Sequence, residues 1–106
     1  MPFIGKRYKI VSVAIQGFSC ADTQELFETG RSQRFGAIRR AATRKLMMLE
    51  AAAVLNDLGS PPGNCLEALA GDRAGQHSIR INSHWRICFV WTNAGPTGVE
   101  ISSHYQ

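Results

Sequence analysis

Hydrophobic and polar side chains alternate along two neighbouring stretches of the chain, residues 78–82 and 85–91. A period of two is typical of a strand with one buried face, because successive side chains of a strand point to opposite faces. The gap between the stretches is short enough for a hairpin, so the pattern predicts two antiparallel strands. The hairpin should bring Arg80 and Arg86 close together on the polar face. Two arginines held by a rigid sheet would offer a binding place for an anion.

Two helical patterns precede the hairpin. A short helix is expected to begin at a cap residue, Asp22 or Thr23, and to end at Gly30. A longer helix is expected over residues 36–58, because apolar residues recur there every three or four positions and would form one stripe. The members of this stripe are Ile38, Ala42, Leu46, Leu49 and Ala53.

The remaining segments supply strands and turns. Residues 10–15 are rich in β-branched side chains and predict an N-terminal strand, which would extend to Phe18. Glycine and proline at residues 59–63 end the long helix, and residues 99–102 alternate as a last strand. The order strand, two helices, then a run of strands predicts an α+β domain whose helices pack on a curled antiparallel sheet of about four strands.

Composition narrows the class of protein. A chain of 106 residues with 44% hydrophobic content supports one domain, residues 1–106. The formal net charge of +4 favours a polyanionic partner. The cysteines, Cys20, Cys65 and Cys88, are odd in number and scattered, which fits a reducing cytosol and neither a disulfide framework nor a zinc site. No apolar run reaches the roughly 20 residues of a membrane span. We expect a cytoplasmic protein with no membrane segment, metal or cofactor.

Basic residues concentrate in the first half of the long helical pattern and just before it. No acidic residue interrupts the chain between Arg31 and Lys45. The ordinary interpretation is a solvated helix face, because charge on an exposed face is common. The alternative is a patch that contacts phosphate groups or an acidic partner. The cations on the helix itself are Arg39, Arg40, Arg44 and Lys45.

Several motifs together resemble a known family. Gly71-Asp72-Arg73 and Trp85-Arg86-Ile87 at this spacing, with residues 61–64 and 66–69, resemble the HigB family of plasmid-maintenance toxins within the RelE superfamily. The resemblance covers the chain from about residue 10 to its end. It implies a RelE/ParE-like fold and a toxin of a type II toxin-antitoxin system. The family's activity is ribosome-dependent endoribonuclease cleavage of mRNA in the decoding site of the 30S subunit, and its antitoxin is a HigA-like helix-turn-helix protein.

The chemistry of RNA cleavage identifies one main candidate. Without a metal, the ribose 2′-hydroxyl is the nucleophile, so the enzyme must remove its proton, protonate the leaving 5′-oxygen and stabilise a phosphorane. A guanidinium suits the last task, because it stays charged and binds two phosphate oxygens. Arg86 matches the position of the superfamily's catalytic arginine. The alternative is a structural ion pair of Arg86 with Glu67, Asp72 or Glu100.

Other cations are candidates for RNA binding. Arg73 lies in a turn, where it would either pair with Asp72 or bind an RNA phosphate. Arg80 shares the polar side of its strand with Asn82 and would position substrate. With RNA as the substrate, the candidates on the long helix are Arg39, Arg40, Arg44 and Lys45. Stacking on bases is an open role for Tyr105, His77 and Trp91, although a core position is the ordinary interpretation of Trp91.

The C-terminus departs from the family pattern. Many relatives end in Asp-Tyr-His, whereas this chain has Ser103-His104-Tyr105 in the equivalent place. His104 and Tyr105 are the candidates for proton transfer, since histidine titrates near neutrality. The alternative for both is a frayed terminus. Relatives also often carry lysine where this chain has Ala70, and some carry histidine where it has Glu67.

Two other functions fit the same fold or charge. ParE-like toxins share the fold but bind DNA gyrase and are not nucleases. This chain lacks some of the acid and base residues of its nuclease relatives, which is compatible with such a binding protein. A non-catalytic basic RNA-binding module is the second alternative. It would bind RNA with a steep salt dependence and leave it intact.

Overall fold

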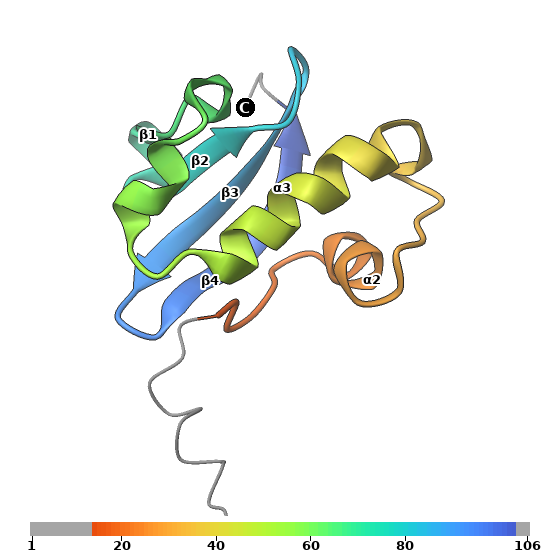
Figure 1. The fold of residues 1–106 in the computed structure, drawn as a ribbon, viewed down its shortest axis with the longest axis horizontal. Coiled ribbons are helices and arrows are strands. Elements are labelled where there is room, and N and C mark those ends of the chain that lie inside the picture. Colours follow the sequence, from red (N-terminus) through yellow and green to blue (C-terminus); the bar gives the residue numbers. More distant parts are fainter. Residues whose placement is uncertain (1–13, 104–106) are drawn as a thin grey trace, which may run out of the picture.

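The computed structural model describes residues 14–103 (Figure 1). Two α-helices, α2 (Ala21–Thr29) and α3 (Arg39–Ala51), precede four strands. The strands are β1 (Glu67–Ala68), β2 (His77–Arg80), β3 (Trp85–Thr92) and β4 (Gly95–Ser103). Short 3-10 helices occupy Gly36–Ile38, Leu55–Gly59, Pro62–Asn64 and Gly71–Arg73. The sheet has the order β1-β2-β3-β4 with every neighbouring pair antiparallel, which confirms the predicted α+β class.

The sheet register divides the strands into an apolar and a polar face. Ile79 pairs with Ile87 and Ile87 with Ile101, so these side chains share one face. Arg80 pairs directly with Arg86, as the predicted hairpin required. Residues in direct register lie on the same side of a sheet, so the polar face carries two cross-strand rows. One row is Glu67, Ser78, Cys88 and Glu100, and the other is Arg80, Arg86 and Ser102.

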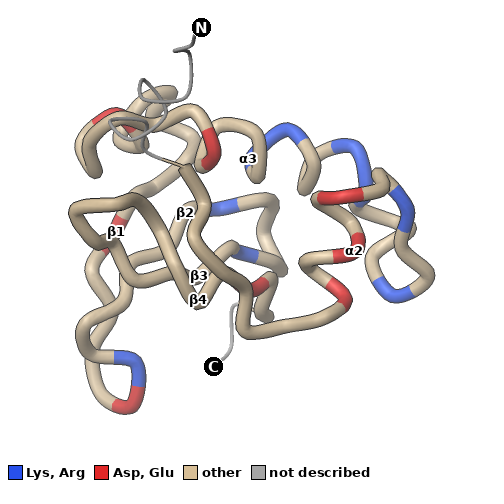
Figure 2. Tube along the Cα trace, turned by 90° about the horizontal axis from the view of Figure 1, so that it is seen from below, with Lys and Arg blue, Asp and Glu red and all other residues tan. Residues whose placement is uncertain are grey.

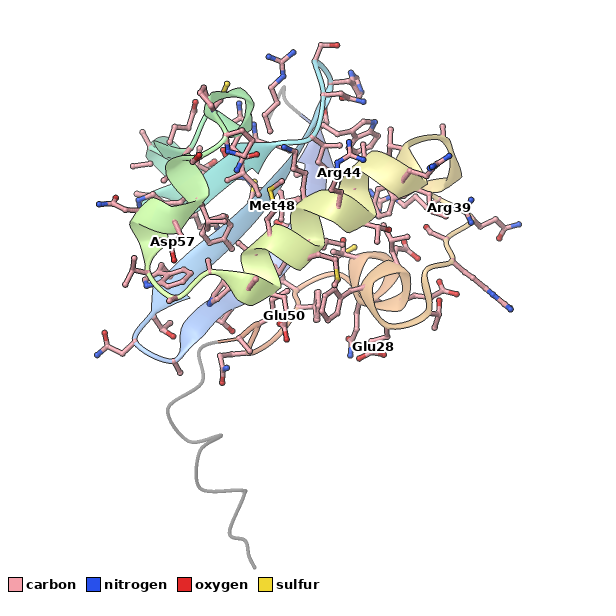
Figure 3. All side chains as sticks on the ribbon, viewed as in Figure 1. Glu28, Arg39, Arg44, Met48, Glu50 and Asp57 are labelled. Atoms are coloured by element: carbon pink, nitrogen blue, oxygen red, sulfur yellow. The ribbon has the colours of Figure 1, made fainter. Side chains whose placement is uncertain are left out.

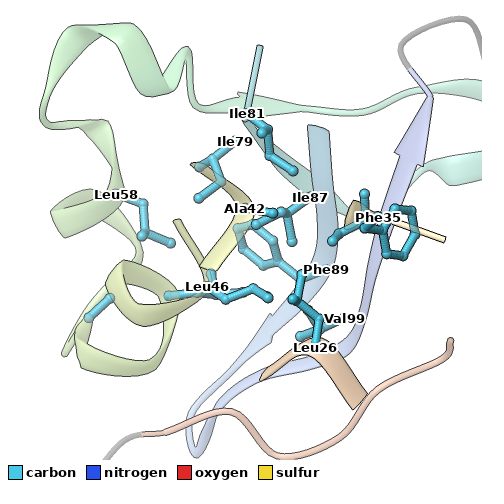
Figure 4. Packing of buried hydrophobic residues seen from close by; sticks show 13 residues of the cluster. Leu26, Phe35, Ala42, Leu46, Leu58, Ile79, Ile81, Ile87, Phe89 and Val99 are labelled. Carbon is cyan, nitrogen blue, oxygen red and sulfur yellow. The ribbon is translucent and has the colours of Figure 1, made fainter. Parts of the chain in front are cut away.

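The core lies between α3 and the apolar face of the sheet. Figure 1 shows α3 lying across this face, with α2 beside it. Ala42 and Leu46 of α3 pack toward Ile87 and Phe89, and all four side chains are buried (Figure 4). Three members of the predicted stripe, Ala42, Leu46 and Leu49, are fully buried, because their spacing places them on one side of the helix. Ala53 is exposed, so the stripe is shorter than predicted.

The long helix ends at Ala51 rather than near Leu58. Ala52 adopts an extended backbone at φ −68° and ψ 130°. The Asp57 carboxylate then accepts hydrogen bonds from the backbone N–H groups of Ala53 (2.9 Å) and Val54 (3.2 Å). Asp57 is the third residue of the 3-10 helix Leu55–Gly59, and its carboxylate binds back to the N–H of the cap residue Val54, which stabilises the start of this new helix. The apolar period continues through this break, which is why the sequence pattern concealed it.

Helix α2 ends at Gly30, as predicted, but its N-terminal cap is not the predicted one. Gly30 adopts the left-handed conformation at φ 75° and donates its N–H to the Leu26 carbonyl (2.8 Å). The cap position belongs to Cys20, and neither Asp22 nor Thr23 occupies it. The buried Thr23 hydroxyl instead accepts a hydrogen bond from the N–H of Ile101 (3.0 Å). This bond ties α2 to β4.

The predicted N-terminal strand is only partly testable, because residues 10–13 lie outside the described residues. Residues 14–17 are irregular, and Phe18 forms an isolated parallel bridge with Val99. The segment still follows β4 closely, since the N–H of Gln16 donates to the Pro96 carbonyl at 2.7 Å. Gly95 at φ 123° permits this approach, because a Cβ there would collide with the Ala14 backbone. Between residues 14 and 103, no helix has the length and apolar character to cross a membrane.

Candidate active site

A pocket of about 740 Å³ opens on the polar face of the sheet. Its floor includes Arg86 and Cys88 of β3, and Glu67 of β1 stands at its side. The segment from Leu69 to Arg73 forms a wall, and Ser103 at the end of β4 completes the lining. Because β3 alternates, the pocket lies on the opposite side of the sheet from the core under α3. This pocket therefore brings together Arg73 and Arg86, two of the arginines predicted from the sequence.

At the floor of this pocket, Arg86 binds Ser78 and Glu67 among the residues that the structure describes. Its Nη1 donates to the Ser78 hydroxyl at 2.9 Å and to the Glu67 carboxylate at 3.2 Å. The Arg86 side chain is 16% exposed, whereas that of Glu67 is 53% exposed. The ion pair with Glu67 that we considered from the sequence is therefore present. An ion pair with one well-exposed partner is weak, so a bound anion can compete with Glu67 for the guanidinium.

Arg73 is fixed across the pocket by a second carboxylate. Its Nη1 donates to Gln76 Oε1 and to Glu100 Oε2, both at 2.9 Å, and its Nη2 lies 3.4 Å from the Ser102 hydroxyl. The Arg73 and Glu100 side chains are both only about a quarter exposed, at 26% and 28%. The alternative that Arg73 pairs with Asp72 is wrong, because Glu100 takes that role. This pair anchors the 3-10 turn Gly71–Arg73 to β4.

Cys88 lines the same pocket as Arg73 and Arg86 and is 1% exposed. Burial raises the pKa of its thiol above the ordinary value, and the nearby Glu100 carboxylate raises it further. Arg73 and Arg86 act in the opposite direction, but burial dominates. At neutral pH the group is a neutral thiol. Cys88 therefore shapes the floor of the pocket and does not act there as a thiolate nucleophile.

The other predicted site residues have different positions. Arg80 is exposed and pairs with Arg86 across the hairpin, outside the pocket lining. His104 and Tyr105, the candidates for proton transfer, lie outside the described residues. They follow Ser103 directly, so the chain passes the pocket immediately before them. The ring of His77 stacks on that of Phe89 with centroids 6.3 Å apart, so one face of the His77 ring is covered by Phe89.

The basic residues of α3 form a separate feature. Arg39, Arg40 and Arg44 line a hollow of about 370 Å³ together with Gly30 and Thr43. Figure 3 shows Arg39 and Arg44 on the N-terminal half of α3, with Glu50 near the other end. This hollow shares no lining residue with the pocket around Arg86. The structure thus separates Arg39, Arg40 and Arg44 from Arg73, and neither lining contains Arg80 or Lys45.

Lys45 differs from its helical neighbours. Its Nζ donates to Oδ1 of Asn64 at 2.6 Å, and Asn64 is completely buried. The lysine therefore attaches α3 to the loop before β1 and is not part of the hollow. In residues 14–103, no group of three or more His, Cys, Asp or Glu side chains is arranged to hold a metal ion.

Sequence reasoning missed part of the site. Ser78 and Gln76 were not named as contacts, and Glu100 was considered only as a partner of Arg86, whereas it binds Arg73. The alternation of the strands contained some of this signal, because Ser78 shares the polar side of β2 with Arg80. The contact of Arg73 with Glu100 joins residues 27 positions apart, and no local pattern indicates it.

Comparisons with known proteins identify the family of this chain. Residues 18–104 match the family described as the RelE-like toxin of the type II toxin-antitoxin system HigB. The chain is 34% identical over 83 residues to Toxin HigB-1 of Vibrio cholerae serotype O1, covering 76% of this chain and 87% of that protein. It is also 34% identical over 65 residues to an uncharacterized protein of Haemophilus influenzae, covering 61% of this chain and 64% of that protein. Such a family implies an antitoxin partner. The chain belongs to the HigB family of RelE-like toxins of type II toxin-antitoxin systems.

Proposed function

We propose that this toxin is an endoribonuclease that cleaves translated mRNA in the decoding site of the 30S subunit without a metal ion. The observation that carries the proposal is the pocket on the polar face of the sheet, where the mostly buried Arg86 lies beside the exposed carboxylate of Glu67. The pocket volume of about 740 Å³ lies in the range of small-molecule sites and accommodates a nucleotide. A ribosomal target also agrees with the expected cytoplasmic location.

Arg86 stabilises the phosphorane in this mechanism. Its guanidinium is held by Ser78 from the sheet, so it needs little reorganisation when a phosphate arrives. Its low exposure strengthens its attraction for the negative charge that develops in the transition state. Phosphate oxygens replace the Glu67 carboxylate as the acceptor of the Arg86 guanidinium. The ion pair with an exposed side chain is weak, whereas a fixed phosphate accepts strong charged hydrogen bonds.

Glu67 is the proposed proton acceptor. Its Oε2 lies 3.2 Å from Nη1 of Arg86, so a phosphate bound to Arg86 brings the adjoining ribose close to this carboxylate. Glu67 takes the 2′-hydroxyl proton while the O2′–P bond forms and the P–O5′ bond breaks. The products are a 2′,3′-cyclic phosphate and a 5′-hydroxyl end. The proton for the departing 5′-oxygen comes from His104 or Tyr105, which remain the candidates for this role.

The neighbouring arginines position the RNA. Arg80 is exposed next to Arg86 and is placed to contact a flanking phosphate. Arg73 already bonds to Glu100, so we propose that it contributes positive potential and holds the pocket wall while RNA binds. These contacts are phosphate contacts and carry no base information. The ribosome, which presents the codon, would then supply the sequence selectivity.

Translation of an end-labelled message with added toxin tests the proposal. We expect cut ends at codon-defined places in translated message and intact naked RNA. Glu67→Gln should slow cleavage about a hundredfold, within the range for loss of a general base. A gyrase poison would leave the message intact, and so would a basic RNA-binding module. Intact transcripts on ribosomes saturated with purified toxin would refute the nuclease function.

A further inference from the structure

The outward side of α3 carries an exposed stripe with an unusual composition. Arg40, Arg44, Met47 and Ala51 follow one another at steps of four, three and four, so they share one helical face, and all four are exposed. We refer to these four residues as the docking stripe. It lies away from the core side of the helix, where Ala42, Leu46 and Leu49 are buried.

The apolar end of the docking stripe is unusually open to solvent. Met47 is 56% exposed, and Val54, three residues beyond the end of α3, is 55% exposed. These two are the most exposed large hydrophobic side chains among residues 14–103. A flexible methionine on a surface is suited to pack against a partner, because it adapts to the shape of the opposite side chains. An apolar contact is therefore available at this end.

The basic end of the docking stripe is open as well. Figure 2 shows the Lys and Arg positions gathered along α3 and the segment that leads into it. Arg39, Arg40 and Arg44 line the hollow of about 370 Å³, and within the described chain none of them has an ion pair or hydrogen bond through its guanidinium. Arg73 and Arg86, by contrast, both bind carboxylates. The three guanidiniums can bind an external anion without breaking an internal pair.

The surroundings of these arginines favour a protein over RNA. RNA-binding surfaces usually combine cations with aromatic side chains on which bases stack. The hollow has no aromatic residue in its lining, and the docking stripe continues into Met47 instead. Arginine and methionine are both enriched in protein interfaces. A partner helix with acidic residues at one end and apolar residues at the other would match both ends of the stripe.

We propose that the docking stripe is the binding surface for an acidic amphipathic helix of the antitoxin. The carboxylates of that helix enter the hollow of Arg39, Arg40 and Arg44, and its apolar side chains cover Met47 and Val54. The proposal names the surface and the chemistry of the partner. It rests on the toxin family and is independent of RNA cleavage.

Titration of the full toxin with the purified antitoxin of the same toxin-antitoxin pair tests this inference. Arg40→Glu combined with Arg44→Glu should weaken the complex about a hundredfold, because buried interfacial charge pairs would become like-charge contacts. Met47→Ser should weaken it about tenfold through lost apolar contact. Ala74→Glu, which adds a negative charge at an exposed residue next to the pocket wall and away from α3, is the control and should bind like the wild type. Circular dichroism melts confirm that each variant is folded.

Hydrogen exchange gives a second readout that needs no substitution. Residues 39–54 should gain protection when antitoxin is added to the wild-type toxin. Unchanged affinity of folded charge-reversal variants, or no added protection in this segment, would overturn the proposal. Loss of ribosome or RNA binding in those variants, with antitoxin affinity retained, would assign the stripe to RNA instead. The binding assays do not depend on cleavage, so their outcome is separate from that of the nuclease proposal.

Discussion

Asn64 should be a main determinant of stability in the segment that leads to the site. Its side chain is fully buried, and Nδ2 donates to the carbonyls of Leu58 (3.1 Å) and Ser60 (3.3 Å). Its Oδ1 accepts from Nζ of Lys45 at 2.6 Å. The amide thus closes the loop between α3 and β1. Since Glu67 lies only three positions further along the chain, this loop also sets where β1 begins.

Asn64→Ala should lower the free energy of unfolding by about 3 kcal/mol. A neutral hydrogen bond contributes about 1 kcal/mol and one to a charged group about 2 kcal/mol, and buried carbonyls that lose their donor add a desolvation cost. For a chain of this size, such a loss lowers the melting temperature by about 12 °C or more. Lys45→Met removes only the charged bond and should lower the free energy of unfolding by about 1–2 kcal/mol.

Urea unfolding followed by circular dichroism measures these differences. Asn56→Ala is the matched control, because Asn56 is exposed, and its free energy of unfolding should stay within about 0.5 kcal/mol of the wild type. The double variant of Lys45 and Asn64 should be less destabilised than the sum of the single changes, since both remove the same bond. A wild-type midpoint for Asn64→Ala would refute the reasoning.

Three further predictions concern the residues around the pocket. Arg73→Met should lower the free energy of unfolding by about 2 kcal/mol, because it leaves the Glu100 carboxylate partly buried without its partner. Glu100→Gln should lower the free energy of unfolding by less. Equal urea midpoints for the wild type and Arg73→Met would contradict this prediction. Iodoacetamide should modify Cys88 far more slowly than the exposed Cys65, because burial raises the pKa of Cys88 and shields it. A raised pKa means that the folded state holds the proton more tightly, so stability should fall as pH rises above the ordinary thiol pKa, and Cys88→Ala should reduce that slope. A slope that is unchanged in Cys88→Ala would exclude this group as the cause.

The sequence predicted those parts of the fold that depend on local periodicity. Alternation across the hairpin placed Arg80 opposite Arg86, and the stripe of α3 identified Ala42, Leu46 and Leu49 as core. The predicted end of the long helix was wrong. The Asp57 carboxylate stabilises a separate helical turn there, although apolar residues continue in the sequence without interruption. Periodicity reports which side a residue would face if the helix continued, and it does not detect a break in the backbone. Ala53 keeps the period of the stripe but is exposed beyond the break.

The site was predictable only in part for a similar reason. Arg86 followed from its strand and from the family motif, since both are encoded within a few residues. Its contact with Glu67 spans 19 positions and that of Thr23 with Ile101 spans 78. Such contacts depend on strand order and register, which no local pattern specifies. The proton donors at the C-terminus remain predictions, because His104 and Tyr105 lie outside the described residues.

Single-turnover cleavage of ribosome-bound message by Arg86 variants tests the central claim most directly. Arg86→Ala should slow the reaction by about 10²–10³-fold, since a preorganised donor to the transition state is lost. Arg86→Lys should restore little, because an ammonium lacks the planar fork that binds two phosphate oxygens. Antitoxin affinity and the melting curve of Arg86→Lys should stay close to those of the wild type. A folded Arg86→Ala variant that cleaves at the wild-type rate would contradict the assignment.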